Sequence, residues 1–234
     1  MMQAGKVPDP WQAEVLTASE RQLLLLGSRQ CGKTLACAAL VLAAALKPNS
    51  LVLVLGPSDR QSKEFLRKVM LFWMAAGRPE QVSGGDTTTK LELANGSRVI
   101  ALPDSEGTIR NYSDVALLCI DEASRVSDEL YLAVRPMLAV SGGRIAALST
   151  PFGRRGWFWE AYQTDPSWRK WIITAEQAPR VLPFMEQERK NGMPERYLKQ
   201  EFFCRFLDPL DAVFRGEDIQ ALVHPELQPA FRWE

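Results

Sequence analysis

Histidine is almost absent from this chain. Among 234 residues there is one, His224, close to the C-terminal end. A metal centre built from several histidines and acid–base catalysis by histidine are therefore not expected. A C-x-x-C pair is also missing, because the cysteines are scattered along the sequence. Cys37 and Cys119 fall within apolar runs, so we expect them to be reduced core residues of an intracellular protein.

Net charge and long apolar runs are lacking too. Basic and acidic residues number 28 each, so no overall positive charge indicates a nucleic-acid ligand, and only a local basic patch remains open. The longest apolar run, residues 35–46, is too short to span a bilayer. The N-terminus has no basic stretch followed by an apolar core, so we expect neither a signal peptide nor a membrane span.

One stretch matches the phosphate-loop pattern G-x-x-x-x-G-K-[ST] at every fixed position. It follows the apolar run 22–26, typical of a buried strand, and precedes the Ala/Leu-rich run 35–46, typical of a buried helix. In this context backbone N–H groups surround phosphate oxygens at a helix N-terminus, which argues against a chance glycine turn. Lys33 is expected to reach the β and γ phosphates, and the Thr34 hydroxyl to bind Mg²⁺. The stretch reads Gly27-Ser28-Arg29-Gln30-Cys31-Gly32-Lys33-Thr34.

A second apolar run, residues 115–120, ends in Asp121 and Glu122. We predict a central strand after which Asp121 holds Mg²⁺, usually through water, and Glu122 activates a water molecule for attack on the γ-phosphate. Acids that cap a following helix are the alternative. The phosphate loop upstream favours the catalytic interpretation. The adjacent glutamate favours hydrolysis over kinase chemistry, since a kinase should avoid activating water.

Ser149 and Thr150 follow a further strand-like run, residues 145–148. Hydroxyl groups at the end of a strand are suited to sensing the γ-phosphate and relaying its loss to the next segment. A simple Ser/Thr turn before Pro151 is the alternative.

Arginines form a third class of candidates, because phosphoryl transfer often uses an arginine to offset charge on the γ-phosphate. Arg29 lies inside the phosphate loop and is the candidate within the same chain. Arg110, in a loop before the Asp121 strand, is a candidate for action across a subunit interface. Arg154 and Arg155 could contact phosphate or DNA. The alternative for each is a solvated surface arginine.

Trp11 and Gln12 precede the first strand. A flat aromatic ring and an amide could stack on an adenine and hydrogen-bond to it. Trp11 could equally anchor the N-terminal arm to the core.

Near-continuous apolar strands alternate with helical stretches, which predicts an α/β fold with a mostly parallel sheet covered by helices on both faces. Composition changes near residue 179, where aromatic and charged residues interleave with prolines. We expect an ATPase core over residues 1–178, and a small lid or linker subdomain with a C-terminal tail over residues 179–234. The expected strands cover residues 22–26, 51–55, 115–120, 145–148 and 171–174, with a hairpin at 91–93 and 98–102 around Asn95-Gly96.

Taken together, these motifs resemble the large terminase subunit of tailed bacteriophages, the ATPase motor that packs DNA into procapsids. The resembling pieces span nearly the whole chain. They are Pro10-Trp11-Gln12, the loop 27–34, Ile109-Arg110, residues 118–123, Ser149-Thr150-Pro151-Phe152-Gly153, Glu201-Phe202, Phe206 and Ala212-Val213-Phe214.

The resemblance implies a P-loop NTPase fold of the ASCE/RecA-like type that uses ATP and Mg²⁺. It assigns adenine recognition to Trp11 and Gln12, the metal and water roles to Asp121 and Glu122, and coupling to Ser149 and Thr150. It also places Arg110 where some members have an arginine acting on the neighbouring subunit.

Partners follow from the resemblance as well: double-stranded DNA, the portal and procapsid, the small terminase subunit, and further copies in a ring, with a pentamer expected on assembly and a monomer in isolation. The location implied is the cytoplasm of the infected bacterium. The family usually continues into an RNase H-like nuclease domain, and this sequence stops where that domain should begin, so we expect no nuclease activity from it.

Two other functions remain open on the sequence. A helicase-like or recombination ATPase would share the motifs but normally needs a second similar domain, for which 234 residues leave no room. A nucleotide-dependent binding module would turn over rarely, and the Glu122 neighbour of Asp121 argues against it.

Overall fold

The computed structural model describes residues 1, 4–103, 112–208 and 222, and these contain an eight-stranded sheet. The strand order is β3-β4-β5-β2-β6-β7-β1-β8. The six neighbouring strands β5-β2-β6-β7-β1-β8 pair in parallel. β4 pairs antiparallel with β5, and β3 pairs antiparallel with β4 at the edge of the sheet. The strands are β1 (Gln22–Gly27), β2 (Leu51–Gly56), β3 (Gln81–Asp86), β4 (Lys90–Leu93), β5 (Arg98–Pro103), β6 (Val115–Asp121), β7 (Arg144–Ser149) and β8 (Trp168–Ile173).

Three central strands bring the sequence motifs to one edge of the sheet. β7 lies between β1 and β6 and pairs in parallel with both, as the ASCE/RecA-like arrangement requires. The phosphate loop follows β1, Asp121 ends β6 and Ser149 ends β7. Because parallel strands end at the same edge, residues more than 100 positions apart in sequence become neighbours.

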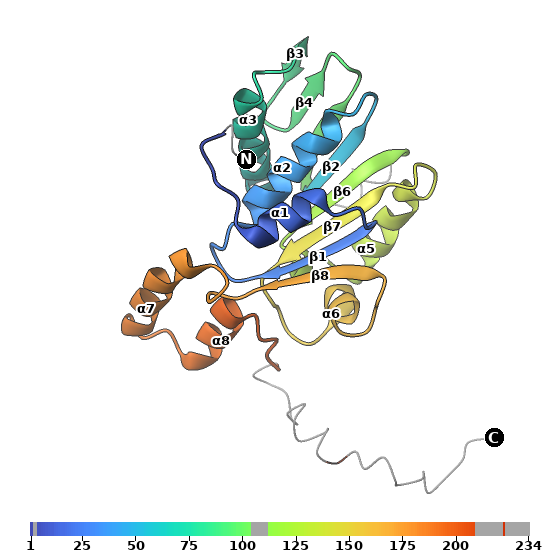
Figure 1. The fold of residues 1–234 in the computed structure, drawn as a ribbon. Helices are drawn as coiled ribbons and strands as arrows, with labels where there is room; N and C mark the ends of the chain where they lie inside the picture. Colours follow the sequence, from blue (N-terminus) through green and yellow to red (C-terminus); the bar gives the residue numbers. More distant parts are fainter. Residues whose placement is uncertain (2–3, 104–111, 209–221, 223–234) are drawn as a thin grey trace, which may run out of the picture.

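Helices cover both faces of the sheet (Figure 1). One face carries α1 (Pro10–Thr17), α2 (Lys33–Ala45) and α3 (Asp59–Ala75), and its core includes Val41, Phe65 and Val69. The opposite face carries η2 (Ala123–Arg125), α5 (Asp128–Val134), η3 (Arg135–Leu138) and α6 (Gly156–Gln163), with a separate core around Tyr131, Trp157 and Phe158. The central strands β1, β2, β6 and β7 are mostly apolar because side chains on both faces are buried.

Most of the expected elements are confirmed, and the differences have local causes. The apolar pattern of residues 128–140 is typical of one helix, but the structure has α5 followed by the 3₁₀ turn η3, since Pro136 has no N–H with which to continue the α-helix. β8 begins at Trp168 rather than residue 171, because Arg169 and Lys170 lie between the two buried tryptophans of this edge strand and interrupt the apolar run. β3 and α1 were not predicted. β3 reads QVSGGD, and its glycines hide a strand in the sequence.

The segment after β8 packs on the same face as α2. It contains η4 (Pro179–Val181), α7 (Leu182–Lys190) and α8 (Glu195–Phe203), which project beside the sheet in Figure 1. Phe202 is fully buried in the core of this face and lies edge-on to Phe184, with ring centroids 5.8 Å apart. The Ala175 N–H donates to the Phe202 carbonyl at 2.8 Å. These contacts fasten the helical segment to the end of β8.

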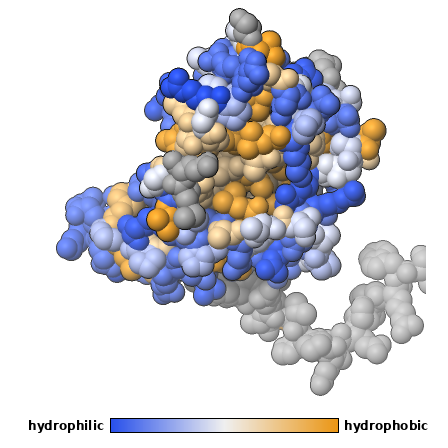
Figure 2. Space-filling view, turned by 45° about the horizontal axis from the view of Figure 1, so that its top comes forward, coloured by the Kyte–Doolittle hydropathy of each residue, from blue (hydrophilic) through white to orange (hydrophobic). Residues whose placement is uncertain are grey.

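One face leaves apolar side chains at the surface. In Figure 2, orange side chains gather in a hollow that is surrounded by blue polar residues. A groove lined by Ala4, Met70, Leu71 and Met74 runs along α3, and the last two side chains are 41% and 51% exposed. No helix in the described part of the chain is long and apolar enough to cross a membrane.

We expect Phe202→Ala to lower the free energy of unfolding by about 3–5 kcal/mol, because it removes a fully buried ring and leaves a cavity where α8 meets the core. Urea denaturation followed by circular dichroism measures the change. Tyr197→Ala on the same helix is the matched control, since Tyr197 is 39% exposed. Equal destabilisation by the two substitutions would contradict the packing of α8 described here.

Candidate nucleotide-binding site

The loop after β1 folds back on itself at the N-terminus of α2. Gln30 and Gly32 adopt left-handed backbone conformations with φ of 58° and 97°, and Gly32 is the N-cap of α2. A side-chain carbon at Gly27 would lie 2.8 Å from the Cys31 sulfur, so any larger residue there would force the Cys31 side chain to move. The Gly32 and Thr34 N–H groups donate to no acceptor among the described residues. Such donors at a helix N-terminus form a cradle suited to phosphate oxygens.

Lys33 is buried at the first position of α2, with 6% of its surface exposed. Burial raises the pKa of the neighbouring Cys31 thiol, and the positive charge of Lys33 partly opposes that rise. The same charge acts on Asp121, whose pKa it lowers against other influences. Lys33 begins α2 just after the β1 loop and Asp121 ends β6, so the parallel strands place both residues at the same edge of the sheet, as a shared phosphate and metal site requires.

Asp121 is a buried carboxyl at the end of β6. Burial, reinforced by the charge of Glu122, raises its pKa to about 6, whereas Lys33 and the Glu122 N–H oppose the rise. The Glu122 N–H donates to Asp121 Oδ1 at 3.0 Å. Glu122 itself has a φ of 50°, an uncommon conformation for a residue with a side chain. Its backbone leaves the strand direction at this point, immediately before η2.

A hydroxyl network joins the end of β6 to the end of β7. Ser124 Oγ lies 2.7 Å from Ser149 Oγ and donates to the Thr150 carbonyl at 2.9 Å. Ser149 Oγ donates to Glu122 Oε2 at 3.4 Å. Ser149 and Thr150, predicted from their place after a strand, are thus brought beside Glu122.

Ser124 was missed by the sequence reasoning. The signal that could have found it is a hydroxyl residue three positions after Asp121, because a single 3₁₀ turn brings position i+3 back over the strand end. Two hydroxyl protons serve three contacts in this network, so its hydrogen bonds have more than one arrangement.

The N-terminal arm reaches the phosphate loop through Gln12. Its Nε2 donates to the Gly32 carbonyl at 3.3 Å, and its Oε1 accepts the Asp9 N–H at 3.0 Å. Trp11 is 8% exposed and belongs to the core of this face. Its burial favours the alternative in which Trp11 anchors the arm, whereas Gln12 lies at the loop itself.

The predicted arginines have different surroundings. The Arg29 side chain is exposed at the loop, and its backbone N–H donates to the Glu201 carbonyl of α8 at 2.7 Å. Arg110 lies outside the described residues. Arg154 pairs with Asp208 at 3.3 Å. Two other arginines after position 150 also form ion pairs. Arg169 Nε lies 4.0 Å from Glu20 Oε1, and Arg189 Nη1 lies 2.7 Å from Glu186 Oε1. Their charge is therefore partly neutralised within the chain.

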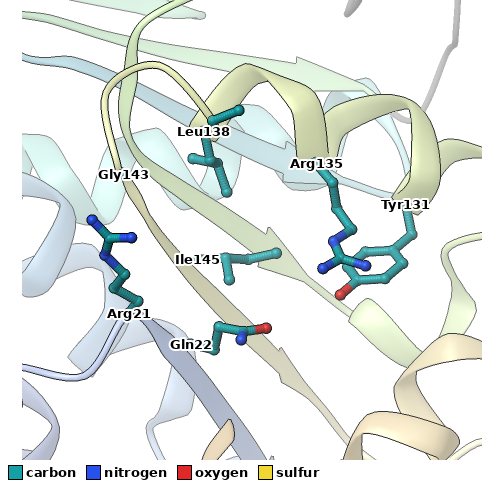
Figure 3. A pocket seen from close by; sticks show the side chains of 8 residues that line it. Arg21, Gln22, Tyr131, Arg135, Leu138, Gly143 and Ile145 are labelled. Atoms are coloured by element: carbon teal, nitrogen blue, oxygen red, sulfur yellow. The ribbon is translucent and has the colours of Figure 1, made fainter. Parts of the chain in front are cut away.

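A separate cleft of about 200 Å³ lies at the opposite end of the strands. Figure 3 shows Arg21, Gln22, Arg135 and Ile145 among the residues that line it. Gln22 and Ile145 are at the beginning of β1 and β7, whereas the phosphate loop and Ser149 are at their ends. The cleft is thus remote from the candidate nucleotide site and adds no group to it.

The metal ligands available at this site, one carboxylate and one hydroxyl, suit a magnesium ion shared with a substrate better than a metal ion coordinated by protein side chains alone. No cluster of three or more His, Cys, Asp or Glu side chains occurs in the part of the chain that the structure describes. One buried carboxylate and one hydroxyl, Asp121 and Thr34, suit Mg²⁺, which keeps several waters and takes further oxygens from substrate phosphates.

The raised pKa of Asp121 predicts how stability depends on pH in metal-free buffer. The folded state binds this proton more tightly than the unfolded state, whose aspartate pKa is about 3.9. The stability that this protonated carboxyl contributes is therefore fully present below about pH 4 and is lost as pH rises through about 6. Between pH 4 and pH 7 we expect the free energy of unfolding of the wild type to fall by on the order of 2 kcal/mol relative to that of Asp121→Asn.

Urea denaturation in EDTA across this range measures the difference between the two proteins. Glu129→Gln, at an exposed position in α5, is the control and should run parallel to the wild type. Parallel curves for Asp121→Asn as well would show that the carboxyl is not buried as described.

The chain is similar to known proteins in sequence and in fold. The family model described as "Terminase large subunit, T4likevirus-type, N-terminal" matches residues 24–221. No curated protein matches the chain. The ATPase domain of the Thermus phage P74-26 large terminase superposes with a TM-score of 0.74 at 17% identity, covering 88% of this chain and 96% of that one.

Two longer terminases have the same fold over about half of their length. The large terminase of a thermophilic bacteriophage, in complex with ADP, gives a TM-score of 0.68 at 14% identity, covering 85% of this chain and 53% of that one. The HK97 bacteriophage large terminase gives 0.67 at 17% identity, covering 86% and 51%. At these identities the solved structures establish the P-loop NTPase fold, and the family model covers most of the sequence. The chain belongs to the family of terminase large subunits of the T4likevirus type, and the part of the family that it matches is the N-terminal region.

Proposed function

We propose that this chain is the ATP-hydrolysing motor domain of a DNA-packaging terminase, coupling hydrolysis to movement of double-stranded DNA into a procapsid. The observation that supports the proposal is the placement of Lys33, at the start of α2 after the β1 loop, and of Asp121 and Glu122, at the end of β6, along the same edge of the sheet. Family membership gives the biological setting. The large terminase of the thermophilic bacteriophage has been solved with ADP and with ATP-gamma-S, which supports a nucleotide as the ligand of this fold.

Each group in the site has a proposed task. The loop N–H groups and Lys33 bind the β and γ phosphates, and Arg29 offsets charge on the γ-phosphate from within the chain. Thr34 and Asp121 hold Mg²⁺, which supplies charge neutralisation between the phosphates when it is bound. Gln12 reads the adenine, with Trp11 fixing the arm that carries it.

Glu122 acts as the general base. It takes a proton from a water whose oxygen bonds to the γ-phosphorus, while the bond from that phosphorus to the β-γ bridging oxygen breaks and leaves ADP. Ser149 contacts this carboxylate, so loss of the γ-phosphate can change the Ser124–Ser149–Thr150 network. We assign coupling to that network, and completion of the site to an arginine of a neighbouring copy, with Arg110 as the candidate.

The remaining partners are proposed from the family: the portal and procapsid, the small subunit, and a ring of copies of this chain. We further propose that residues 1–178 form the ATPase core and residues 179–234 a lid or linker. Two alternatives make different predictions. A helicase-like ATPase would unwind duplex DNA, and a binding module would hydrolyse slowly without acceleration by DNA or by self-association.

Replacing the proposed base tests the chemistry. We expect Glu122→Gln to lower phosphate release from Mg·ATP by at least about 100-fold, as is typical for loss of a general base, while the affinity for ATP is retained. Glu129→Gln, an exposed carboxylate on α5, is the matched control. Hydrolysis by Glu122→Gln within a few-fold of wild type would remove Glu122 from this role.

The proposed motor function has its own test. Specific activity should rise with protein concentration and on addition of DNA and procapsids, because a neighbour completes each site. Wild-type protein that binds ATP but stays inactive under all of these conditions would contradict the proposal.

Ser124→Ala tests the hydroxyl network. We expect hydrolysis to fall by roughly tenfold, equivalent to one lost hydrogen bond, with ATP affinity unchanged because the hydrogen-bond partners of the Ser124 hydroxyl are Ser149 and Thr150 rather than the phosphate loop. Ser127→Ala is the control: it removes a nearby hydroxyl that caps α5 through the Leu130 N–H and does not contact Glu122. A wild-type rate for Ser124→Ala would exclude the network from catalysis.

A further inference from the structure

Arg180 is in contact with the phosphate loop although it lies 149 residues beyond it. It belongs to η4, the first helical segment after β8, and its Nη2 donates a hydrogen bond to the Cys31 carbonyl. Its Nη1 forms an ion pair with Asp9 Oδ2 at 2.6 Å. Asp9 is the N-cap of α1, the helix that carries Gln12. One guanidinium therefore joins the loop, the N-terminal arm and the beginning of the lid.

The contact with Cys31 determines the direction of a donor in the cradle. In a planar trans peptide the carbonyl oxygen and the N–H point in opposite directions. A carbonyl of Cys31 held on the Arg180 side therefore turns the Gly32 N–H to the other side. That N–H donates to no acceptor among the described residues, so it remains available to a phosphate oxygen.

Gln12 acts in the same way on the next peptide. Its Nε2 holds the Gly32 carbonyl, and its Oε1 accepts the N–H of Asp9, the residue that pairs with Arg180. These contacts close into a ring around two successive loop peptides, and its members are Asp9, Gln12, Cys31, Gly32 and Arg180. A side-chain carbon at Gly32 would lie 2.9 Å from Gln12 Nε2 and 3.0 Å from Arg180 Nη2, so both side chains lie directly against the loop.

We propose that Arg180 is a positioning residue for the phosphate loop, which aims the Gly32 N–H at the nucleotide and makes the loop geometry depend on the lid. This inference rests on the nucleotide site proposed above. Because η4 leads directly into α7 and α8, displacement of the lid withdraws the donor from the Cys31 carbonyl and frees the Cys31–Gly32 peptide. The N-terminal arm is released at the same time, because Asp9 loses its ion pair with Arg180.

A surface ion pair without function is the competing explanation, and it predicts a different result. The Arg180 and Asp9 side chains are 47% and 24% exposed, and pairs of this kind add little to folding stability. A pair of that sort would leave both unfolding and nucleotide binding almost unchanged when it is removed. The proposal instead predicts a change in phosphate binding with little change in unfolding.

The experiment measures binding of Mg·ATP and of inorganic tripolyphosphate by calorimetry, together with thermal unfolding without ligand. For Arg180→Ala we expect both ligands to bind roughly tenfold more weakly, the fold-change that corresponds to one charge-assisted hydrogen bond. Arg180→Lys, which keeps the charge but cannot reproduce the two-pronged contact, should recover part of the affinity. Arg189→Ala, which removes an arginine paired with Glu186 on α7, is the matched control.

Tripolyphosphate separates the loop from the arm, because it has no adenine for Gln12 to contact. Weakened binding of ATP alone, with tripolyphosphate unaffected, would overturn the assignment of Arg180 to the phosphate cradle. So would wild-type binding of both ligands by Arg180→Ala, or a loss of affinity that is explained by unfolding of both Arg180 variants.

A double-mutant cycle tests the ring of contacts. Asp9→Asn should weaken ATP binding, and its effect should largely disappear when Arg180 is already alanine. Additive effects would contradict the coupling of arm and lid through this pair. Wild-type protein that binds neither Mg·ATP nor tripolyphosphate would reject the proposed nucleotide site itself, a result distinct from each of these.

Discussion

The parallel pairing of β1, β7 and β6 is the constraint on which the rest of the structure depends. Residues 22–26 pair with 145–149, and β7 in turn pairs with residues 117–121, so all three strands end at one edge of the sheet. A one-residue slip in either pairing would exchange the two faces of a strand. It would bury the wrong side chains in both cores and turn Asp121 away from Lys33. The two helical layers therefore hold the register that the site needs.

Burial at this edge of the sheet destabilises the charged form of Asp121. Its carboxyl is buried at the end of a central strand, next to a second carboxylate, and its pKa is raised by both. Lys33 compensates only in part. A cation arriving with phosphate oxygens supplies the missing charge, so the features that make the site unfavourable for the free protein favour binding of a metal–nucleotide complex. Destabilisation of this kind is expected where a site is arranged for a ligand.

Local patterns predicted the strands and the loop, and long-range contacts could not be predicted from them. The phosphate loop, the Asp121-Glu122 pair and the Asn95-Gly96 hairpin are each encoded within about ten residues, so the sequence identifies them without a model of the fold. The contact of Arg180 with the Cys31 carbonyl depends on how the chain after β8 turns back toward the phosphate loop, and no spacing in the sequence signals it. Trp11 shows a further difficulty: core anchors and adenine platforms use the same residue type, and only burial separates them. Arg110 remains a prediction from the sequence.

The segment after β8, for which we propose a lid role, supports the phosphate loop directly. Ser28 donates its N–H to the Ile173 carbonyl of β8, and Arg29 donates to Glu201 of α8, both at 2.7 Å. Together with the Arg180 contact, these bonds fix the loop backbone from outside, on groups that a phosphate does not need. A loop held by the residues that follow β8 changes shape when they move. In the proposed motor, hydrolysis therefore reaches the rest of the molecule by two routes, through Ser149 at the end of β7 and through the lid, and each depends on a few hydrogen bonds rather than on repacking of the core.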